Sequence, residues 1–330
     1  MISRTQEPLA SGADLDPAVS MAPTAPGSVR LPADVLRPLQ RIEVGRALSA
    51  LAGTWTLILV TLAVALRWPH WAVWLAAALV IGRCQHALAV LMHDAAHYRL
   101  FDHRRWNDVV GQWLCARPIA SHLSAYRAVH LRHHKYLHTA RDPDLSLSAP
   151  FPCGRDSFLR KLVRDASGLS ALVMRGYVTV DRGGRMRLSR GNLLTRWTPA
   201  TLALRLVLLA VVIGVCWAGY GPAALCLWVL PLLIVYQVLL RLRGVLEHAG
   251  VPDTQDPLRN ARTVVSHNPL ARFFLNPHHV AYHLEHHLYP GVPHYRLPAL
   301  HAALRATGGF GSALVQERYA VAFGAVMGQA

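Results

Sequence analysis

Apolar residues concentrate in four long runs along the chain, at about 48–66, 71–92, 198–219 and 221–240. Each run is long enough to cross a hydrocarbon core of ~30 Å as a helix. The two runs of each pair are separated by no more than four residues. The pattern therefore predicts two helical hairpins, each of which returns the chain to the side of the membrane where it started.

The rest of the chain is more polar. Residues 1–30 are rich in Ala, Pro, Ser and Gly without apolar periodicity, which predicts a disordered tail. Residues 31–330 predict a single domain, in which 93–197 and 241–330 form a helical cap on the side that both termini share. The predicted fold class is an all-α integral membrane protein with four transmembrane helices in two hairpins and a cap.

Composition and charge agree with a membrane protein. The 330 residues are 53% hydrophobic and only 16% charged, with a mean hydropathy of +0.25, which is too apolar for an ordinary soluble domain. The net charge is +16, but no nucleic-acid-binding motif accompanies it, so we expect no nucleic-acid partner. Because the arginines gather between and after the apolar runs, the positive-inside rule places the cap and both termini in the cytoplasm, beneath the inner membrane.

The cysteines limit the redox chemistry that the chain could carry by itself. All five are scattered, without a C-x-x-C pair, which argues against a disulfide framework, a thiolate metal site or a fused iron–sulfur domain. Any electrons that the chemistry requires must come from another protein. The basic surface is suited to attract an acidic electron-transfer partner.

Histidines form three clusters at the cap ends of the predicted hairpins. The first has the spacing H-x-x-x-H, and the second and third both have the spacing H-x-x-H-H. Residues at i, i+3 and i+4 share one face of a helix, so we expect each cluster to aim its imidazoles at one point. Neutral imidazole is a good ligand for Fe, Zn, Cu or Ni, and eight histidines suit two metals better than one tetrahedral zinc ion.

Other metal proteins explain the pattern less well. The segment His93–His97 is close to the zinc-protease pattern H-E-x-x-H, but Asp94 replaces the glutamate base and six histidines are left over. A bis-histidine haem would use single ligands within the bilayer. A transporter needs ionisable residues inside its spans, and the runs offer only Arg83, His86 and Arg205. A non-enzymatic metal-binding or metal-sensing membrane protein remains an alternative.

The clusters, their order and their placement around two hairpins resemble the membrane fatty-acid desaturase/hydroxylase superfamily of di-iron enzymes. The resemblance covers about residues 48–305, and includes Thr139–Asp144 (TARDPD), Tyr282–Pro290 (YHLEHHLYP) and the later Val292-Pro293 and Leu297–His301. It implies two iron ions and O2 as a co-substrate. By this resemblance the metal ligands are His93, His97, His130, His133, His134, His283, His286 and His287.

Similar proteins use a ninth histidine between the last span and the third cluster, and His248 stands in that place. Many relatives also carry an asparagine about one helical turn before the third cluster. Here the nearest asparagine is Asn276, whereas His279 lies four residues before His283. His279 is therefore a further possible ligand, and His138 has a weaker claim.

Carboxylates near the clusters are expected to orient the imidazoles by accepting their distal N–H groups. The candidates are Asp94, Asp142, Asp144, Glu247 and Glu285. The other histidines are predicted to be structural or to lie on the surface: His70, His103, His122, His267, His294 and His301.

The resemblance favours an O2-dependent fatty-acyl or lipid desaturase that introduces a C=C bond into an alkyl chain, since the third cluster and the following Leu288-Tyr289-Pro290 look like those of acyl desaturases. A hydroxylase, a carotenoid ketolase or an alkene-forming oxidative decarboxylase could use the same centre. The short turns on the far side predict that the substrate arrives from the membrane or the cytosol. A separate donor, such as ferredoxin with its reductase, is the expected source of electrons.

Overall fold

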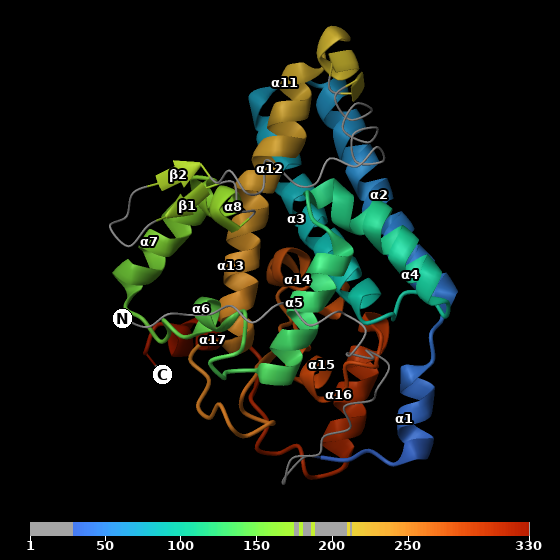
Figure 1. Ribbon diagram of the computed structural model, residues 1–330, viewed down its shortest axis with the longest axis vertical. Coiled ribbons are helices and arrows are strands. Elements are labelled where there is room, and N and C mark those ends of the chain that lie inside the picture. The colour runs from blue at the N-terminus through green and yellow to red at the C-terminus, as the bar shows by residue number, and fades with distance from the viewer. Residues whose placement is uncertain (1–28, 175–177, 181–185, 189–209, 212, 330) are drawn as a thin grey trace.

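The computed structural model describes residues 29–174, 178–180, 186–188, 210–211 and 213–329, and these are mostly helical (Figure 1). The predicted tail lies outside the described residues except for Val29, which is buried, and Arg30. Most of the third apolar run also lies outside them. The predicted all-α class needs one adjustment, because the described residues include four short strands.

Among the described residues, three helical segments are long and apolar enough to cross a membrane. They are α2 (Val44–Arg67), α3 (Trp71–Ala96) and a continuous segment, Gly221–His248, which comprises α11 (Gly221–Ala224), η3 (Leu225–Val229), α12 (Leu230–Leu233) and α13 (Val235–His248). Two of these segments run past the predicted runs into the cap. Consequently His93 lies on α3 and His248 on α13, the two helices whose other residues pack in the apolar core.

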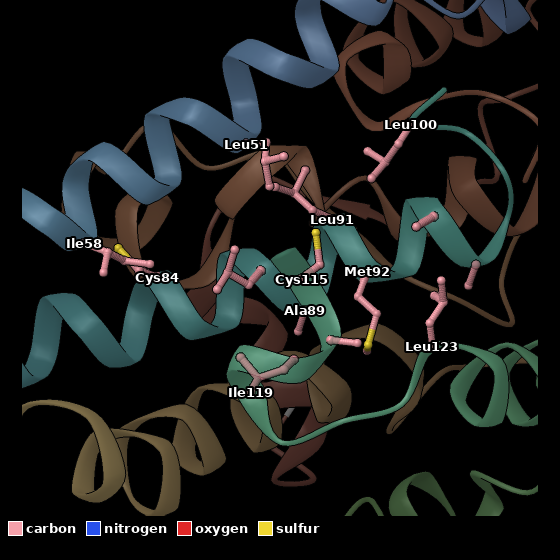
Figure 2. Close-up of a cluster of buried hydrophobic side chains, with 14 of the residues drawn as sticks. Leu51, Ile58, Cys84, Ala89, Leu91, Met92, Leu100, Cys115, Ile119 and Leu123 are labelled. Carbon is pink, nitrogen blue, oxygen red and sulfur yellow. The ribbon is translucent and has the colours of Figure 1, made fainter. Parts of the chain in front are cut away.

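The apolar core joins α2, α3 and the Gly221–His248 segment. Leu51 and Ile58 of α2 pack with Cys84 and Leu91 of α3, and Tyr236 of α13 joins the same cluster (Figure 2). Helix α3 is the central element, since most of its second half is buried. The core therefore fixes the position of the last turn of α3, which carries His93.

Pro231 does not end the last membrane helix. Proline lacks an N–H group and collides with the carbonyl four residues earlier in a regular α-helix. Here the preceding residues Leu225–Val229 adopt a π-helical turn, in which the wider spacing of the carbonyl groups relieves that collision. The segment then continues through α12 and α13 to His248.

The segments that the sequence predicts as the cap, 93–197 and 241–330, contain shorter elements, and we keep the name cap for them. After α3 come α4 (Arg104–Val110), η1 (Gly111–Ala116), η2 (Arg117–Ile119), α5 (Leu123–Tyr136), α6 (Leu145–Ser148), α7 (Arg155–Ala166), α8 (Leu169–Met174), β1 (Val178–Val180) and β2 (Met186–Leu188). After α13 come β3 (Thr263–Val264), α14 (Pro269–Leu275), η4 (Pro277–His279), α15 (His283–Leu288), η5 (His294–Arg296), α16 (Leu297–Ala306), β4 (Val315–Gln316) and α17 (Tyr319–Val326). Before α2, the chain forms α1 (Ala33–Gln40).

Two features tie the carboxyl-terminal part of the cap together. Strand β3 pairs with β4 in parallel, with Thr263 opposite Val315. A second apolar core contains Leu284 and Leu288 of α15, Leu300 of α16 and Leu39 of α1. The short helix α15 is thereby held between α16 and β3, which fixes the direction of its histidines.

Candidate metal centre

Nine histidines gather into two groups at the ends of α3 and α13 and on α5 and α15. In each group the candidate ligand atoms all lie within 4.8 Å of one another. Group one comprises His93, His97, His130, His134 and His286. Group two comprises His133, His248, His283 and His287. The eight histidines of the clusters and His248 are thus brought together as two neighbouring donor sets.

The spacing of the two H-x-x-H-H clusters predicted that each would aim its imidazoles at one point. This prediction is wrong, because each cluster is divided between the two groups. The residues four apart turn to the same group, whereas the histidine between them turns to the other. In α5, His130 and His134 belong to group one and His133 to group two. In α15, His283 and His287 belong to group two, and His286 to group one. The reason is angular, because positions i and i+4 lie about 40° apart around a helix but i+3 lies on the other side of i, about 60° away.

The spacing of the nitrogen atoms fits metal ligation. In group one, the Nε2 atoms of His97 and His130 and those of His130 and His134 are each 3.0 Å apart. In group two, the Nε2 atom of His248 lies 2.8 Å from that of His283 and 3.1 Å from that of His133. Two nitrogen ligands about 2.1 Å from one ion and at right angles to each other would lie about 3.0 Å apart.

The protonation and burial of these imidazoles also fit a metal. Burial, together with the neighbouring imidazoles, lowers the pKa well below the ordinary value of 6.5 for His97, His130, His134, His283, His286 and His287. These rings are neutral at physiological pH, the form that binds metals. The Nε2 atom of His93 is buried and has no hydrogen-bond partner among the described residues. A buried polar atom of this kind is costly unless a ligand satisfies it.

The end of α13 is fixed by a buried arginine that the sequence reasoning did not consider. The guanidinium of Arg262 donates hydrogen bonds to the carbonyl oxygens of Leu246 (2.8 Å), Ala249 (3.1 Å) and Gly250 (3.1 Å). These carbonyl groups lie at the helix end, where partners within the helix are missing. Burial lowers the pKa of Arg262 to about 10, so it stays charged. It therefore holds the helix turn that presents His248.

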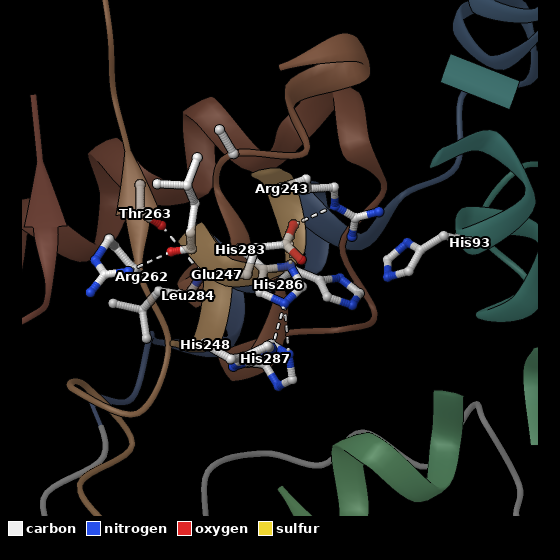
Figure 3. A network of polar contacts seen from close by, with 12 residues as sticks. His93, Arg243, Glu247, His248, Arg262, Thr263, His283, Leu284, His286 and His287 are labelled. Atoms are coloured by element: carbon white, nitrogen blue, oxygen red, sulfur yellow. Dashed lines mark hydrogen bonds and ion pairs between the residues drawn. The ribbon is translucent and has the colours of Figure 1, made fainter. Parts of the chain in front are cut away.

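Two of the predicted carboxylates lie against histidines of group two. Asp142 Oδ1 accepts a hydrogen bond of 2.9 Å from the Nδ1 atom of His133. Glu247 accepts one of 2.5 Å from Arg243, and its carboxylate lies 3.4 Å from the Nδ1 atom of His283 (Figure 3). Contacts of this kind fix the ring orientation and the tautomer of a ligand. Asp144 is more distant, 3.9 Å from the Nδ1 atom of His133.

Two other carboxylates have different partners from those expected. Glu285 binds Thr263 and lies 2.5 Å from the Nδ1 atom of His301. It faces away from the histidines of both groups, since it lies two residues after His283 on a short helix. Asp94 is 2.6 Å from the Nδ1 atom of His294 but 3.6 Å from that of His93.

His294 and His301 are thus buried partners of carboxylates. The sequence reasoning left open whether they were structural or on the surface, and the structure assigns them to the interior.

The two further ligand candidates lie outside both groups. The described residues that form the groups do not include His279, whose ring instead lies near Tyr282. The Nε2 atom of His138 is 2.7 Å from the carbonyl oxygen of Asn260. That contact joins the end of the second cluster to the loop before β3.

A cavity of about 630 Å³ reaches the centre from one side. Its wall includes His130 of group one and three histidines of group two, His133, His248 and His283. Apolar side chains from α3, α5 and α13, such as Met92, Val129 and Leu240, line the remainder together with polar ones. A ligand in this cavity would touch histidines of both groups.

The fold and this centre define a mostly helical membrane-type protein with two adjoining histidine groups that could hold metal ions. The fatty acid desaturase family model matches residues 69–319, and the chain belongs to that family. It is also similar to dihydrorhizobitoxine desaturase from Bradyrhizobium elkanii, with 29% identity over 238 residues, or 69% of this chain. The match spans 66% of that relative's length.

Proposed function

We propose that the protein is a di-iron, O2-dependent desaturase that introduces a C=C bond into the alkyl chain of a fatty-acyl or lipid substrate. The observation that carries the proposal is the division of nine histidines into two groups beside one cavity. Family membership and the relative, which is named a desaturase, support the reaction type. Imidazole nitrogen suits iron, as it also suits zinc, copper and nickel, and the resemblance to di-iron desaturases favours iron among these metals.

The iron ions, when bound, supply the oxidising power that removes hydrogen from an unactivated C–H bond. Overall, the substrate loses two hydrogen atoms, and O2 takes up these, two electrons and two protons to form two water molecules. A separate donor, such as ferredoxin with its reductase, supplies the electrons. The chain's own residues hold and orient the metal ligands and exclude competing reactions.

The cavity walls set the position of the substrate. Met92, Val129 and Leu240 would pack against an alkyl chain and keep water from it. Small changes in that position decide whether a second hydrogen is lost or oxygen is added. The shape of the cavity therefore determines whether the product is an alkene or an alcohol.

We place the centre on the cytoplasmic side of the inner membrane. All three membrane-type segments are apolar, and α3 and the Gly221–His248 segment both end at the centre. The arginines gather in the polar segments between and after the apolar runs, which favours the cytoplasm for that part of the chain. An acyl substrate would enter from the membrane or the cytosol.

The test is to measure metal content, O2 uptake and products on one detergent-purified sample. The sample receives ferredoxin, its reductase and either a mixed fatty-acyl pool or dihydrorhizobitoxine, and a His97→Ala variant serves as the inactive control. Two irons per chain and products lighter by two hydrogens support the proposal. Products heavier by one oxygen would indicate a hydroxylase, a carbonyl product a ketolase, and a terminal alkene with loss of CO2 a decarboxylase. Stoichiometric zinc without O2 uptake would exclude an oxygenase and favour a metal-binding role.

A further inference from the structure

A second pocket, of about 430 Å³, lies outside the histidine centre and its cavity. One wall is the start of α2, where Gly45, Arg46 and Ser49 share one face of the helix. The other wall carries four ring side chains, which are His278, His279, His294 and Tyr295. None of the described residues lines both this pocket and the cavity. We call it the α2 pocket.

The α2 pocket and the cavity lie on different sides of α3. Met92 lines the cavity, whereas Asp94, two residues later, points to the opposite side of the helix. Asp94 accepts hydrogen bonds from the backbone N–H group of His294 (3.0 Å) and from its Nδ1 atom (2.6 Å), and His294 lines the α2 pocket. A ligand in this pocket would therefore leave the cavity free for a substrate.

Two imidazoles of the pocket are held by an unusual backbone conformation. His278 and His279 have φ values of 51° and 60°, in the left-handed region that favours glycine. A larger residue in this region costs conformational energy, and such positions cluster where proteins bind ligands. The chain thus places two imidazoles beside the pocket at positions that glycine would occupy more easily.

The imidazoles offer unused acceptor atoms to the pocket. Thr54 donates its hydroxyl hydrogen to the carbonyl oxygen of Ala50 (2.9 Å), so it accepts from the Nε2–H group of His278 (3.0 Å). In the neutral ring, the Nδ1 atom of His278 is then an acceptor. His294 donates from Nδ1 to Asp94, which leaves its Nε2 atom as an acceptor. His294 is only 3% exposed, and neither acceptor has a hydrogen-bond partner among the described residues. A ligand of this pocket must therefore bring hydrogen-bond donors.

The charges around the pocket are mainly positive. Four arginines act on its side chains, which are Arg46 in the wall itself and Arg83, Arg272 and Arg296 beside His278, His279 and Tyr295 respectively. Two carboxylates act on the same side chains, Glu43 and Asp94. Glu43 forms ion pairs with both Arg46 and Arg296. With four cations against two carboxylates, the surroundings of the pocket favour an anion.

The pocket lies at the border of the apolar surface. Beyond it, α2 exposes apolar side chains such as Leu48, Leu59 and Val60. Helix α14, which precedes His278, has no buried residue and exposes Leu270. In a protein whose α2 crosses a membrane, acyl chains cover such side chains. The first turns of α2, and with them the pocket, are therefore expected at the level of the lipid headgroups.

We propose that the α2 pocket binds an anionic phospholipid whose headgroup carries hydroxyl groups, as in phosphatidylglycerol. The phosphate lies beside Arg46, and the headgroup hydroxyls donate hydrogen bonds to His278 Nδ1 and His294 Nε2. Basic pockets beside membrane helices on the cytoplasmic side suit anionic headgroups. Gly45 leaves the wall open, since a Cβ atom added there would have nothing within 4 Å. This site goes beyond the proposed function, because it needs neither metal nor substrate.

The experiment fills the pocket with a side chain. Gly45→Leu adds a leucine to its wall. Gly53→Leu, on the same helix, adds one outside the pocket, where a Cβ atom also has nothing within 4 Å. The purified protein in detergent is mixed with equimolar phosphatidylglycerol and phosphatidylcholine of identical acyl chains, and native mass spectrometry counts the bound lipid. Phosphatidylcholine has the same phosphate but no net charge and no donor in its headgroup. Because the measurement needs neither metal nor turnover, its outcome is independent of the reaction proposed above.

We expect the unmodified protein and Gly53→Leu to prefer phosphatidylglycerol about tenfold, and Gly45→Leu less than about twofold. Arg46→Gln should weaken the binding of phosphatidylglycerol about fivefold, which is the contribution of one basic residue near a membrane surface. Arg67→Gln removes an exposed arginine at the other end of α2 and should weaken it less than about twofold.

Equal preference for phosphatidylglycerol in Gly45→Leu and Gly53→Leu would overturn the proposal. So would complete displacement of the lipid from the unmodified protein by excess inorganic phosphate, because the pocket would then be a site for free phosphate. If Gly45→Leu does not fold, Arg46→Gln and Arg67→Gln decide the question, and equal lipid binding by these two variants would also overturn the proposal.

Discussion

His248 shows how a single side chain completes the centre. It lies at the last position of α13 and approaches both His133 and His283 through its Nε2 atom. Group two has only four histidines, whereas group one has five. The loss of one imidazole should therefore weaken group two more than group one.

His248→Asn should lower the bound metal from two ions to about one per chain and reduce product formation by at least about a hundredfold, since loss of orienting contacts alone costs 10–100-fold in metal affinity or activity. Metal content by mass spectrometry and product yield measure the effect. His267→Asn, at an exposed histidine outside both groups, is the matched control. Two ions retained in His248→Asn would show that His248 is not a ligand.

Asp142 orients a proposed ligand without belonging to either group. Burial raises the pKa of its carboxyl, but hydrogen bonds from His133 and from the backbone N–H groups of His138 and Asp144 outweigh burial, so that the pKa is lowered. The carboxylate thus contributes stability above the ordinary aspartate pKa, and this contribution is lost as the pH falls through the lowered value.

Asp142→Asn should weaken metal binding by about 10–100-fold and remove the acid-dependent part of the thermal stability that this residue contributes. Competition with a chelator at neutral pH, and melting temperatures between neutral and acidic pH, test both effects. Asp156→Asn, at an exposed position on α7, should change neither. An unchanged chelator titration in Asp142→Asn would contradict the role of this carboxylate.

At the scale of the elements, the spacing of the clusters predicted which histidines gather but not how they divide. The division depends on where the ends of α3 and α13 place His93 and His248. The positions of these helix ends in space cannot be read from the local spacing of histidines. The partners of Asp94 and Glu285 were missed for a similar reason. His294 is 200 residues from Asp94 in sequence, and no periodic pattern connects them. Three of the four apolar runs, by contrast, correspond to the core helices, because hydrophobicity and length are local properties; most of the third run lies outside the described residues.

The contact between α3 and α13 should be sensitive to one added methyl group. A Cβ atom at Gly82 would lie 2.5 Å from both Cβ and Cγ1 of Val235, whereas one at Gly53 on α2 would have nothing within 4 Å. Gly82→Ala should lower the free energy of unfolding by about 1–3 kcal/mol through overpacking, and should displace the helices that carry His93 and His248. Thermal unfolding in detergent and metal content measure these effects. Gly53→Ala is the control, and equal behaviour of the two variants would show that the close contact does not position the centre.

At the scale of the whole molecule, the core, the cap and the cavity have separate tasks. The apolar core packs α3 and α13 against α2 and so positions the histidines at their ends. Helices α5 and α15 of the cap carry the other histidines of the two groups. The cavity opens between α3, α5 and α13. The two histidine groups and the cavity wall come from the same elements and share four residues, His130, His133, His248 and His283, but the rest of the wall lies outside both groups. It should therefore be possible to block the cavity without removing the metals.

Two alanines on the same exposed stretch of α5 make that separation testable. Ala125 lines the cavity, whereas Ala128, three residues later, is exposed and does not line it. Ala125→Phe should place a ring where the substrate lies and reduce turnover roughly tenfold or more, since small misplacements of a reacting group have large effects on rate. Both variants should keep the metal content of the unmodified protein. Because the added ring occupies volume, the loss in Ala125→Phe should grow with the length of the acyl chain supplied, whereas Ala128→Phe should show no such trend. Equal turnover of the two variants across a chain-length series would mean that the substrate reaches the centre by another route.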